Sequence, residues 1–303
     1  MNSENEHQYS FWVKVAARTS FVVAVVLVLI KLYAWFVSGA ASMLASATDS
    51  LLDLFASGLN LLILIYALKP ADKEHRFGHG KAESLAGIAQ AAFINGSALL
   101  LIFHGIERVL YPVAIEKTDV AVTVTLVSLA LTIGLVLLQK VVISKTKSVI
   151  VQADSLHYQS DILLNLAVLA ALLLSNYLWA QADGLFTILV GAYLCFGTKE
   201  IVKQSLDQLL DRELSAEDIA IAQEIIAKHR QVLGFHQLRT RQSGPRKFVQ
   251  LHLELPNELS LLEAHHIADD IERQISQALS PCEVIIHQDP SAVVAKELRD
   301  EVD

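Results

Sequence analysis

The stretch Ser46-Ala47-Thr48-Asp49-Ser50-Leu51-Leu52-Asp53 places two carboxylates inside a long apolar segment. Because four positions separate Asp49 from Asp53, both side chains project from one face of a helix, one turn apart. A carboxylate at membrane depth costs at least about 2.5–3.5 kcal/mol on insertion scales, so such residues are usually functional. The alternative is a pair of polar residues that only join neighbouring helices. The second carboxylate at this spacing favours a functional site.

The composition is typical of a membrane protein. Of the 303 residues, 53% are hydrophobic and only 18% are charged, and the mean hydropathy is +0.44. A soluble domain would carry more charge. The two cysteines, Cys195 and Cys282, lie far apart and form neither a disulfide framework nor a CxxC motif, so we expect both to be packing residues. The acidic, polar start is unlike a secretory signal, and we expect the first apolar run to be a retained span.

Six segments are long enough to cross a bilayer, which needs about 20 apolar residues. The predicted spans are 12–37, 40–67, 84–110, 119–143, 149–178 and 183–205. The sequence therefore predicts a polytopic α-helical membrane protein, with a cytoplasmic N-terminal segment over 1–11 and a six-helix transmembrane domain over 12–208.

The basic residues predict the orientation of these spans. Two basic residues, Arg108 and Lys117, lie on one side of the membrane. Eleven lie on the other side: Lys14, Arg18, Lys69, Lys73, Arg76, Lys81, Lys140, Lys145, Lys147, Lys199 and Lys203. This asymmetry predicts a multi-pass membrane protein with both termini in the cytoplasm. Lys31 is left within the first span, nearer its outer end, from which it can snorkel to the membrane surface.

The periodicity changes after about residue 211. Ser215-Ala216-Glu217-Asp218 predicts a helix N-terminus with a carboxylate in the capping-box position, before an amphipathic run over 219–229. Alternating residues predict strands over 235–242 and 247–255, joined by a turn at Ser243-Gly244-Pro245-Arg246. A helix over 261–279 and a strand over 283–287, ending at Gln288-Asp289-Pro290, complete an αββαβ, ferredoxin-like α+β domain. We expect this cytoplasmic domain over 209–292, followed by a flexible tail over 293–303.

The charge of the chain is concentrated in this second part. Residues 1–210 hold 14 Lys and Arg against 15 Asp and Glu, whereas residues 211–303 hold 10 against 17. An acidic domain argues against nucleic-acid binding. It is compatible with attraction of cations, although a solvated acidic surface is the more common reason for such a charge.

The fifth span repeats the spacing of the second. His157 and Asp161 stand four positions apart, so two facing helices bring Asp49, Asp53, His157 and Asp161 together. Three carboxylates and one imidazole suit a tetrahedral Zn²⁺ site and are poorly suited to Cu(I). A proton relay or a buried polar network is the alternative. We expect Asp154, nearer the cytoplasmic end, to be a solvated residue at the mouth of the site.

The same four ligands predict exchange of metal for protons. Each must be deprotonated to bind metal, so protons compete for the same atoms. Metal would bind from the near-neutral cytoplasm, and protons entering from outside would displace it when the site faces outward.

Two further groups of ligand-type residues lie outside the spans. Asp72, His75 and His79, in the loop between the second and third spans, have the composition of a three-ligand site open to water. A charged loop near lipid head groups explains them equally well. The tail domain carries a third group, which suggests metal binding: His236, His252, His265, His266, His287 and Asp289.

With these residues in place, the chain resembles the cation diffusion facilitator family, and in particular its bacterial ferrous-iron and zinc efflux members. The resemblance covers about residues 12–295. Besides the four intramembrane residues, it rests on Lys69-Pro70-Ala71-Asp72, Phe77-Gly78-His79-Gly80-Lys81-Ala82-Glu83-Ser84, Leu156-His157-Tyr158-Gln159-Ser160-Asp161, Arg239-Thr240-Arg241-Gln242-Ser243-Gly244-Pro245 and Ile286-His287-Gln288-Asp289-Pro290.

The resemblance implies a homodimeric antiporter in the lipid bilayer, which exports Zn²⁺, and often Cd²⁺, in exchange for protons by alternating access. It implies a transport site at Asp49, Asp53, His157 and Asp161, and a loop zinc site at Asp72, His75 and His79. In the tail it implies a structural binuclear zinc cluster bridged by Asp289, whose other ligands are His236, His252, His265 and His287. His266 is a local alternative ligand, and Ser291 stands where close relatives can carry Cys. Lys81 and Asp211 match a salt-bridge pair near the junction of the two domains.

The sequence thus predicts a transporter, not an enzyme, with Zn²⁺ as both substrate and structural ion. Fe²⁺ and Mn²⁺ remain open as physiological ions beside Zn²⁺ and Cd²⁺. Two other functions remain: a membrane-anchored zinc sensor that transports nothing, and a proton-coupled exporter of small organic solutes. A ligand set at bilayer depth argues against the sensor. The absence of an aromatic lining around the four ligands argues against the solute exporter.

Overall fold

The computed structural model describes residues 2–39, 41–111, 119–173 and 182–294. The chain divides into two units, each described by itself: a helical unit, Ser10–Leu206, and a tail unit, which comprises Asp207–Asp303 with Met1–Tyr9. The predicted end of the fifth span at residue 178 and most of the predicted tail over 293–303 lie outside the described residues.

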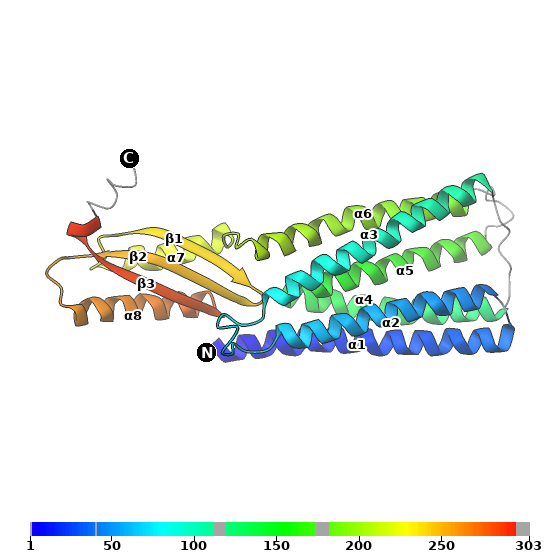
Figure 1. The fold of residues 1–303 in the computed structure, drawn as a ribbon, viewed down its shortest axis with the longest axis horizontal. Coiled ribbons are helices and arrows are strands. Elements are labelled where there is room, and N and C mark those ends of the chain that lie inside the picture. The colour runs from blue at the N-terminus through cyan, green and yellow to red at the C-terminus, as the bar shows by residue number, and fades with distance from the viewer. Residues whose placement is uncertain (1, 40, 112–118, 174–181, 295–303) are drawn as a thin grey trace. The chain divides into compact units, whose positions relative to one another are not determined.

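Long helices run side by side in the helical unit (Figure 1). They are α1 (Asn2–Ser38), α2 (Ala41–Ala67), α3 (Lys81–Leu110), α4 (Asp119–Thr146), α5 (Val149–Leu173) and α6 (Ala182–Leu209). Among the described residues, five of them, all but α5, are long and apolar enough to cross a membrane. The α5 helix carries Asp154, His157 and Asp161, which lower its hydropathy. The predicted class of a six-helix membrane protein is confirmed.

Small residues allow two of these helices to approach closely. A Cβ added at Gly105 of α3 would lie 2.8 Å from the carbonyl oxygen of Gly184 in α6, and one added at Gly184 would lie 2.6 Å from the carbonyl oxygen of Gly105. Close packing of this kind supplies van der Waals contact where lipid removes the hydrophobic driving force between helices. The same interface continues into a cluster of buried residues from α3, α5 and α6: Ala91, Ile94, Ala98, Val149, Ala153, Leu156, Leu194 and Ile201.

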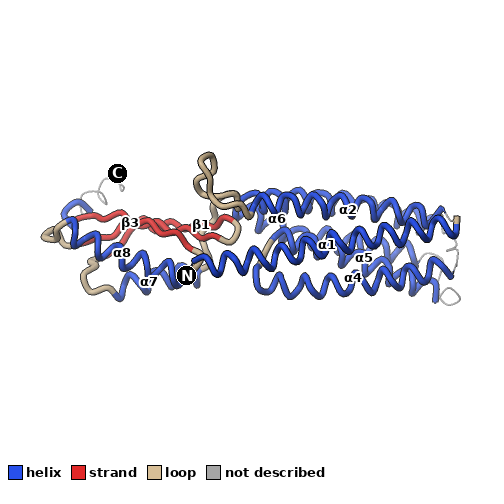
Figure 2. The backbone as a smooth tube through the Cα atoms, turned by 90° about the horizontal axis from the view of Figure 1, so that it is seen from below, coloured by secondary structure: helices blue, strands red, loops and turns tan. Residues whose placement is uncertain are grey.

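The tail unit is the predicted α+β domain. Its elements are α7 (Ala216–Lys228), β1 (Gly234–Ser243), β2 (Arg246–Leu255), α8 (Leu261–Ala278) and β3 (Cys282–Pro290). In the sheet order β1-β2-β3, β1 pairs antiparallel with β2 and β2 pairs parallel with β3. Both helices lie on one face of the sheet (Figure 2). Between them and the sheet lies an apolar core that includes Val249, Leu251, Leu253, Ile267, Ile271 and Ile275.

The N-terminus of α7 has one of the two hydrogen bonds of the predicted capping box. The hydroxyl oxygen of Ser215 accepts from the backbone N–H of Asp218 at 3.2 Å, which satisfies one orphan donor of the first turn. The carboxylate of Asp218 instead accepts from Nζ of Lys247 on β2, at 2.8 Å. It thereby joins the helix to the sheet.

The third strand is longer than predicted. The prediction that it ends at residue 287 is wrong, because parallel pairing with β2 continues through His252↔His287 to Leu255↔Pro290. Gln288-Asp289-Pro290 resembles a turn in sequence, but Pro is tolerated at the end of an edge strand. The extension places His287 and Asp289 on the same face of the sheet, since side chains alternate along a strand.

Candidate metal centres

The first candidate centre lies between α2 and α5. Nε2 of His157 lies 2.8 Å from Oδ1 of Asp53 and 4.0 Å from Oδ2 of Asp161. One ligand atom from each residue falls within 4.8 Å of the others. The side chains of His157, Asp53 and Asp161 are 12%, 21% and 28% exposed, so the group is largely buried. Two residues 104 positions apart in sequence, Asp53 on α2 and His157 on α5, therefore meet at the predicted site.

The fourth predicted ligand stands slightly apart. Asp49 lies one turn before Asp53 on α2 and is exposed, and it is not among the three residues whose ligand atoms converge. Asp49 and Asp53 are neighbours on one face of α2 at this spacing. Asp49 as a ligand stays a prediction.

A buried hydroxyl pair joins the same two helices beside this centre. Oγ of Ser57 lies 3.0 Å from the phenolic oxygen of Tyr158, in a buried contact. Tyr158 is fully buried, and its ring lies 5.5 Å from that of His157. Sequence reasoning missed this pair. The signal that could have found it is position, since Ser57 follows Asp53 by one turn of α2 and Tyr158 is next to His157.

Asp154 is not the solvated mouth residue that the sequence predicted. It is 6% exposed, and one of its oxygens accepts from Nε2 of Gln139 on α4 at 2.8 Å. The same nitrogen donates to Oγ of Ser20 on α1 at 3.1 Å. Asp154 and Ser20 also line a small cavity with Asn60. One face of α5 is turned toward α1 and α4 here, so a position near the helix start is inside the bundle.

Lys31 does not have the environment expected of a snorkelling residue. Its Nζ donates to Oγ of Ser50 on α2 at 2.7 Å. Ser50 is 1% exposed and directly follows Asp49. The ammonium therefore points toward the carboxylate-bearing part of α2.

The second candidate centre is the loop between α2 and α3. Nε2 of His79 lies 3.3 Å from Oδ2 of Asp72, and Nδ1 of His75 lies 3.6 Å from Oδ1 of the same carboxylate. The structure thus brings all three predicted loop residues together, within 4.8 Å by their ligand atoms.

The loop holds these ligands in place by local hydrogen bonds. Oδ1 of Asp72 accepts from the backbone N–H groups of Glu74 and His75 at 2.9 and 2.7 Å. These bonds, that from His75 foremost, lower the pKa of the Asp72 carboxyl below its ordinary value. Nδ1 of His79 lies 3.3 Å from the carbonyl oxygen of Lys69. When Nδ1 donates there, Nε2 is left free for a metal ion.

The third candidate centre lies on the face of the tail sheet opposite the helices. Oδ2 of Asp289 lies 2.8 Å from Nδ1 of His252 and 3.6 Å from Nε2 of His236, whereas Oδ1 lies 3.1 Å from Nε2 of His287. Oδ2 thus faces two histidines, His236 and His252, and Oδ1 faces a third, His287. This arrangement allows one carboxylate to bridge two ions. A bulge between His236 and Arg239 turns β1 at this point.

The residues of the tail centre fit a metal ion. His236 is largely buried, and among the described residues neither of its ring nitrogens has a hydrogen-bond partner. Glu254 Oε1 lies 3.3 Å from its Nδ1, but without hydrogen-bond geometry. A buried imidazole with two unsatisfied nitrogens is costly. A metal ion bound at Nε2, between His236 and Asp289, would remove part of that cost.

One predicted tail ligand lies elsewhere in this chain. His265 is exposed on α8, with its ring centre 6.0 Å from that of His266. Because α8 packs on the other face of the sheet, no described contact joins His265 to the third centre. Its role as a ligand, and that of His266, stay predictions.

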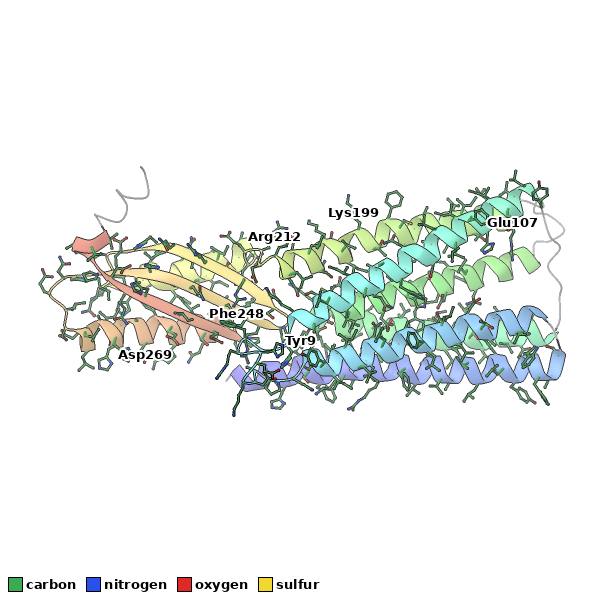
Figure 3. The ribbon with its side chains drawn as sticks, viewed as in Figure 1. Tyr9, Glu107, Lys199, Arg212, Phe248 and Asp269 are labelled. Carbon is green, nitrogen blue, oxygen red and sulfur yellow. The ribbon has the colours of Figure 1, made fainter. Side chains whose placement is uncertain are left out.

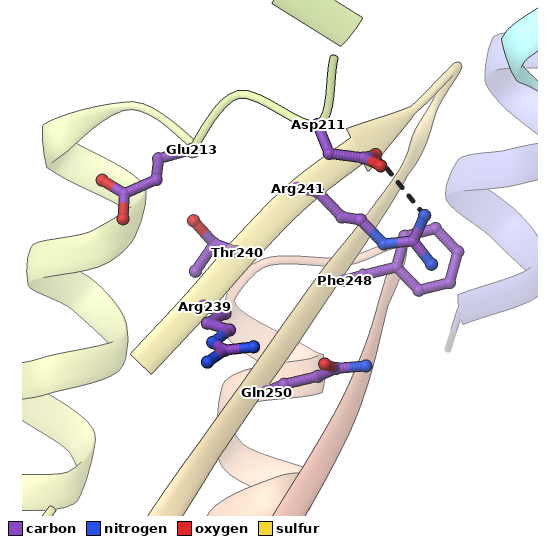
Figure 4. A pocket seen from close by; sticks show the side chains of 7 residues that line it. All are labelled: Asp211, Glu213, Arg239, Thr240, Arg241, Phe248 and Gln250. Atoms are coloured by element: carbon purple, nitrogen blue, oxygen red, sulfur yellow. Dashed lines mark hydrogen bonds and ion pairs between the residues drawn. The ribbon is translucent and has the colours of Figure 1, made fainter. Parts of the chain in front are cut away.

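Asp211 belongs to a pocket of about 290 Å³ at the start of the tail unit (Figure 4). Its Oδ1 lies 3.5 Å from Nη1 of Arg241, whose guanidinium stacks 4.6 Å from the ring centre of Phe248. Lys81 lies in the other unit, and its predicted salt bridge with Asp211 stays a prediction.

Comparisons with known proteins agree with this arrangement. The model of the cation efflux transmembrane domain matches residues 17–210, and the model of the cation efflux protein cytoplasmic domain matches residues 214–291. Both family models thus follow the division between helices and tail domain.

Two curated relatives match along nearly the whole chain. The cation-efflux pump FieF of Shewanella oneidensis is 52% identical over 287 residues, which cover 94% of this chain and 97% of that protein. FieF of Yersinia enterocolitica is 45% identical over 290 residues, which cover 96% and 97%. Among solved structures, the zinc form of CzrB is 35% identical and covers 27% of this chain and 94% of its own, with a TM-score of 0.25.

Proposed function

This chain belongs to the cation diffusion facilitator family of cation-efflux transporters, and from that premise we propose that it exports Zn²⁺ from the cytoplasm in exchange for protons. It is a multi-pass membrane transporter, not an enzyme. The observation that carries the proposed ion exchange is the convergence of Asp53 and Asp161 on His157, from two helices, in the interior of the helical unit.

The donor set supports Zn²⁺ as the substrate. One imidazole nitrogen and carboxylate oxygens suit Zn²⁺ and similar divalent ions, and the general affinity order favours Zn²⁺ over Fe²⁺ and Mn²⁺. Cd²⁺ and Fe²⁺ are proposed as further substrates, because geometry and availability also contribute to selectivity. Asp49 would supply the fourth ligand.

The exchange of Zn²⁺ for protons follows because both bind to the same ligand atoms. In the inward-facing state the deprotonated Asp53, His157 and Asp161 take up a Zn²⁺ ion from the cytoplasm. In the outward-facing state protons from outside bind these groups and displace the ion. The protonated site then returns inward and releases its protons. Both termini are proposed to lie in the cytoplasm of a bacterium, with the helices in its inner membrane.

The other two centres are assigned to supporting roles. We assign zinc to the tail centre at His236, His252, His287 and Asp289, where it would join the cytoplasmic domains of a homodimer. The cytoplasmic-domain family model is compatible with this assembly. The loop centre at Asp72, His75 and His79 is assigned a further zinc ion.

Transport in proteoliposomes tests the exchange. Vesicles with an acidic interior are expected to accumulate Zn²⁺ against its gradient, because protons leaving the vesicle drive metal inward. A protonophore should abolish the accumulation. If the Zn²⁺ flux is the same with and without the pH gradient, the protein is a facilitated-diffusion carrier and not an antiporter.

A further inference from the structure

Lys31 places a positive charge next to the candidate transport site. Its Nζ is held by Oγ of Ser50 at 2.7 Å, in a partly buried contact between α1 and α2. Ser50 stands between Asp49 and Asp53 in the sequence of α2. The ammonium also lies within electrostatic range of the carboxylates of Asp49 and Asp161.

A hydrogen bond that only joins two helices does not require a lysine. A serine, threonine or asparagine can make an interhelical hydrogen bond without placing a charge inside a membrane span. Charged residues in spans are expensive, and they mark ion pathways and counter-ions. The charge of Lys31 is therefore the property to be explained.

The charges of the four proposed ligands balance one divalent cation when Lys31 is counted. Asp49, Asp53 and Asp161 carry three negative charges when ionised, and neutral His157 carries none. One ammonium leaves two negative charges, which a single divalent cation neutralises. Without Lys31, the metal-loaded site would keep a net negative charge in a medium of low dielectric, where opposite charges attract strongly.

We propose that Lys31 is a fixed counter-charge of the transport site, which weakens the hold of the carboxylates on a divalent cation enough for the ion to be released. This inference rests on the proposed function. Lys31 does not itself bind the metal. It acts on the ligands through its field, and Ser50 positions it.

Zinc affinity of the purified full-length protein tests the proposal. The measurement uses a background with Asp72→Ala and Asp289→Ala, which removes the loop and tail centres, and calorimetric titration with Zn²⁺. We expect Lys31→Met to lower the Kd for Zn²⁺ by about tenfold or more, because the field of one unit charge on a divalent ion is lost. In transport, KM and the maximal rate should both fall, since tighter binding slows release.

Three matched variants separate charge from packing. Lys31→Arg keeps the charge and should restore Kd and KM to near the starting values. Lys199→Met removes a lysine from the exposed face of α6 (Figure 3) and should change neither constant. If Lys31→Met does not fold, Lys31→Gln is measured against the same expectations. Loss of helix packing alone would weaken zinc binding, the opposite direction.

The proposal is overturned if removal of the charge leaves Kd unchanged or raises it, or if Lys31→Arg behaves like Lys31→Met. Asp53→Ala in the same background tests the site separately. Loss of zinc binding there supports the site whatever Lys31 does. Retained binding would show that the transport site is elsewhere, and the inference would fall with it.

Discussion

Asp289 on β3 and His252 on β2 lie 2.8 Å apart, from carboxylate Oδ2 to ring Nδ1. The contact depends on the strand register, because His252 pairs directly with His287 and Asp289 follows two residues later on the same face. The other oxygen of Asp289 faces His287 at 3.1 Å. One carboxylate thus connects both parts of the tail centre.

The first prediction concerns this carboxylate. Asp289→Ala should lower the zinc content of the purified protein and weaken the homodimer, because the histidines lose their shared partner. Metal analysis and sedimentation measure the two effects. Glu283→Ala, an exposed change on the same strand, is the control and should alter neither. An Asp289→Ala protein with full zinc content would contradict the tail assignment.

The second prediction separates structure from ligation in the loop. Oδ1 of Asp72 accepts two backbone N–H groups, and Oδ2 faces His79. Asp72→Asn keeps an acceptor for the backbone but is a poor metal ligand, so it should lose loop-bound zinc while the loop keeps its form. Asp72→Ala should lose both. Zinc stoichiometry and the rate of proteolysis in the loop measure these effects. Equal zinc content in wild type and Asp72→Asn would contradict the loop site.

The third prediction concerns the buried polar group of the helical unit. Asp154→Ala would remove the acceptor of a buried hydrogen bond from Gln139 and should cost about 1–3 kcal/mol of stability. Asp154→Asn keeps an acceptor at the same place and should cost less. Thermal unfolding of the purified protein ranks the variants. If both melt at the wild-type temperature, Asp154 does not have the buried contacts described.

The fourth prediction uses the thiol of the tail core. Burial raises the pKa of Cys282 to about 12, above the value of about 8.5 for a free cysteine. The folded state therefore keeps the proton that the unfolded state loses. Stability from this group is complete below about pH 8.5 and falls as the pH rises toward 12. Wild type should lose more stability than Cys282→Ala between pH 8.5 and 11 in chemical unfolding. Parallel pH profiles would contradict this.

The grouping of candidate ligands was predictable where spacing alone brings them together. His157 and Asp161 are one turn apart on α5, and the loop residues Asp72, His75 and His79 are close in sequence. The same spacing of Asp49 and Asp53 predicted Asp49 as a fourth ligand, which stays a prediction. The helix and strand pattern of the tail followed from periodicity and from Ser215. In each case the relevant contact is local or depends on a single periodic element.

Contacts set by the partners of an element were not predictable. The length of β3 depends on pairing with β2. The sequence alone therefore placed the end of the strand too early, at Gln288-Asp289-Pro290. The burial of Asp154 depends on Gln139, in a different helix. The position of the Lys31 side chain depends on its hydrogen bond to Ser50. The sequence of a span does not distinguish a lysine that snorkels to the membrane surface from one that bonds to a neighbouring helix. These differences arise from tertiary packing, which a single sequence does not show.

The most direct test of the proposed exchange is Zn²⁺ flux through His157→Ala in proteoliposomes, with Gln152→Ala on the same helix as the matched control. We predict that His157→Ala remains dimeric but shows no flux above empty vesicles under an imposed pH gradient, and that Gln152→Ala transports normally. Flux through His157→Ala at the wild-type rate would contradict the transport site between α2 and α5.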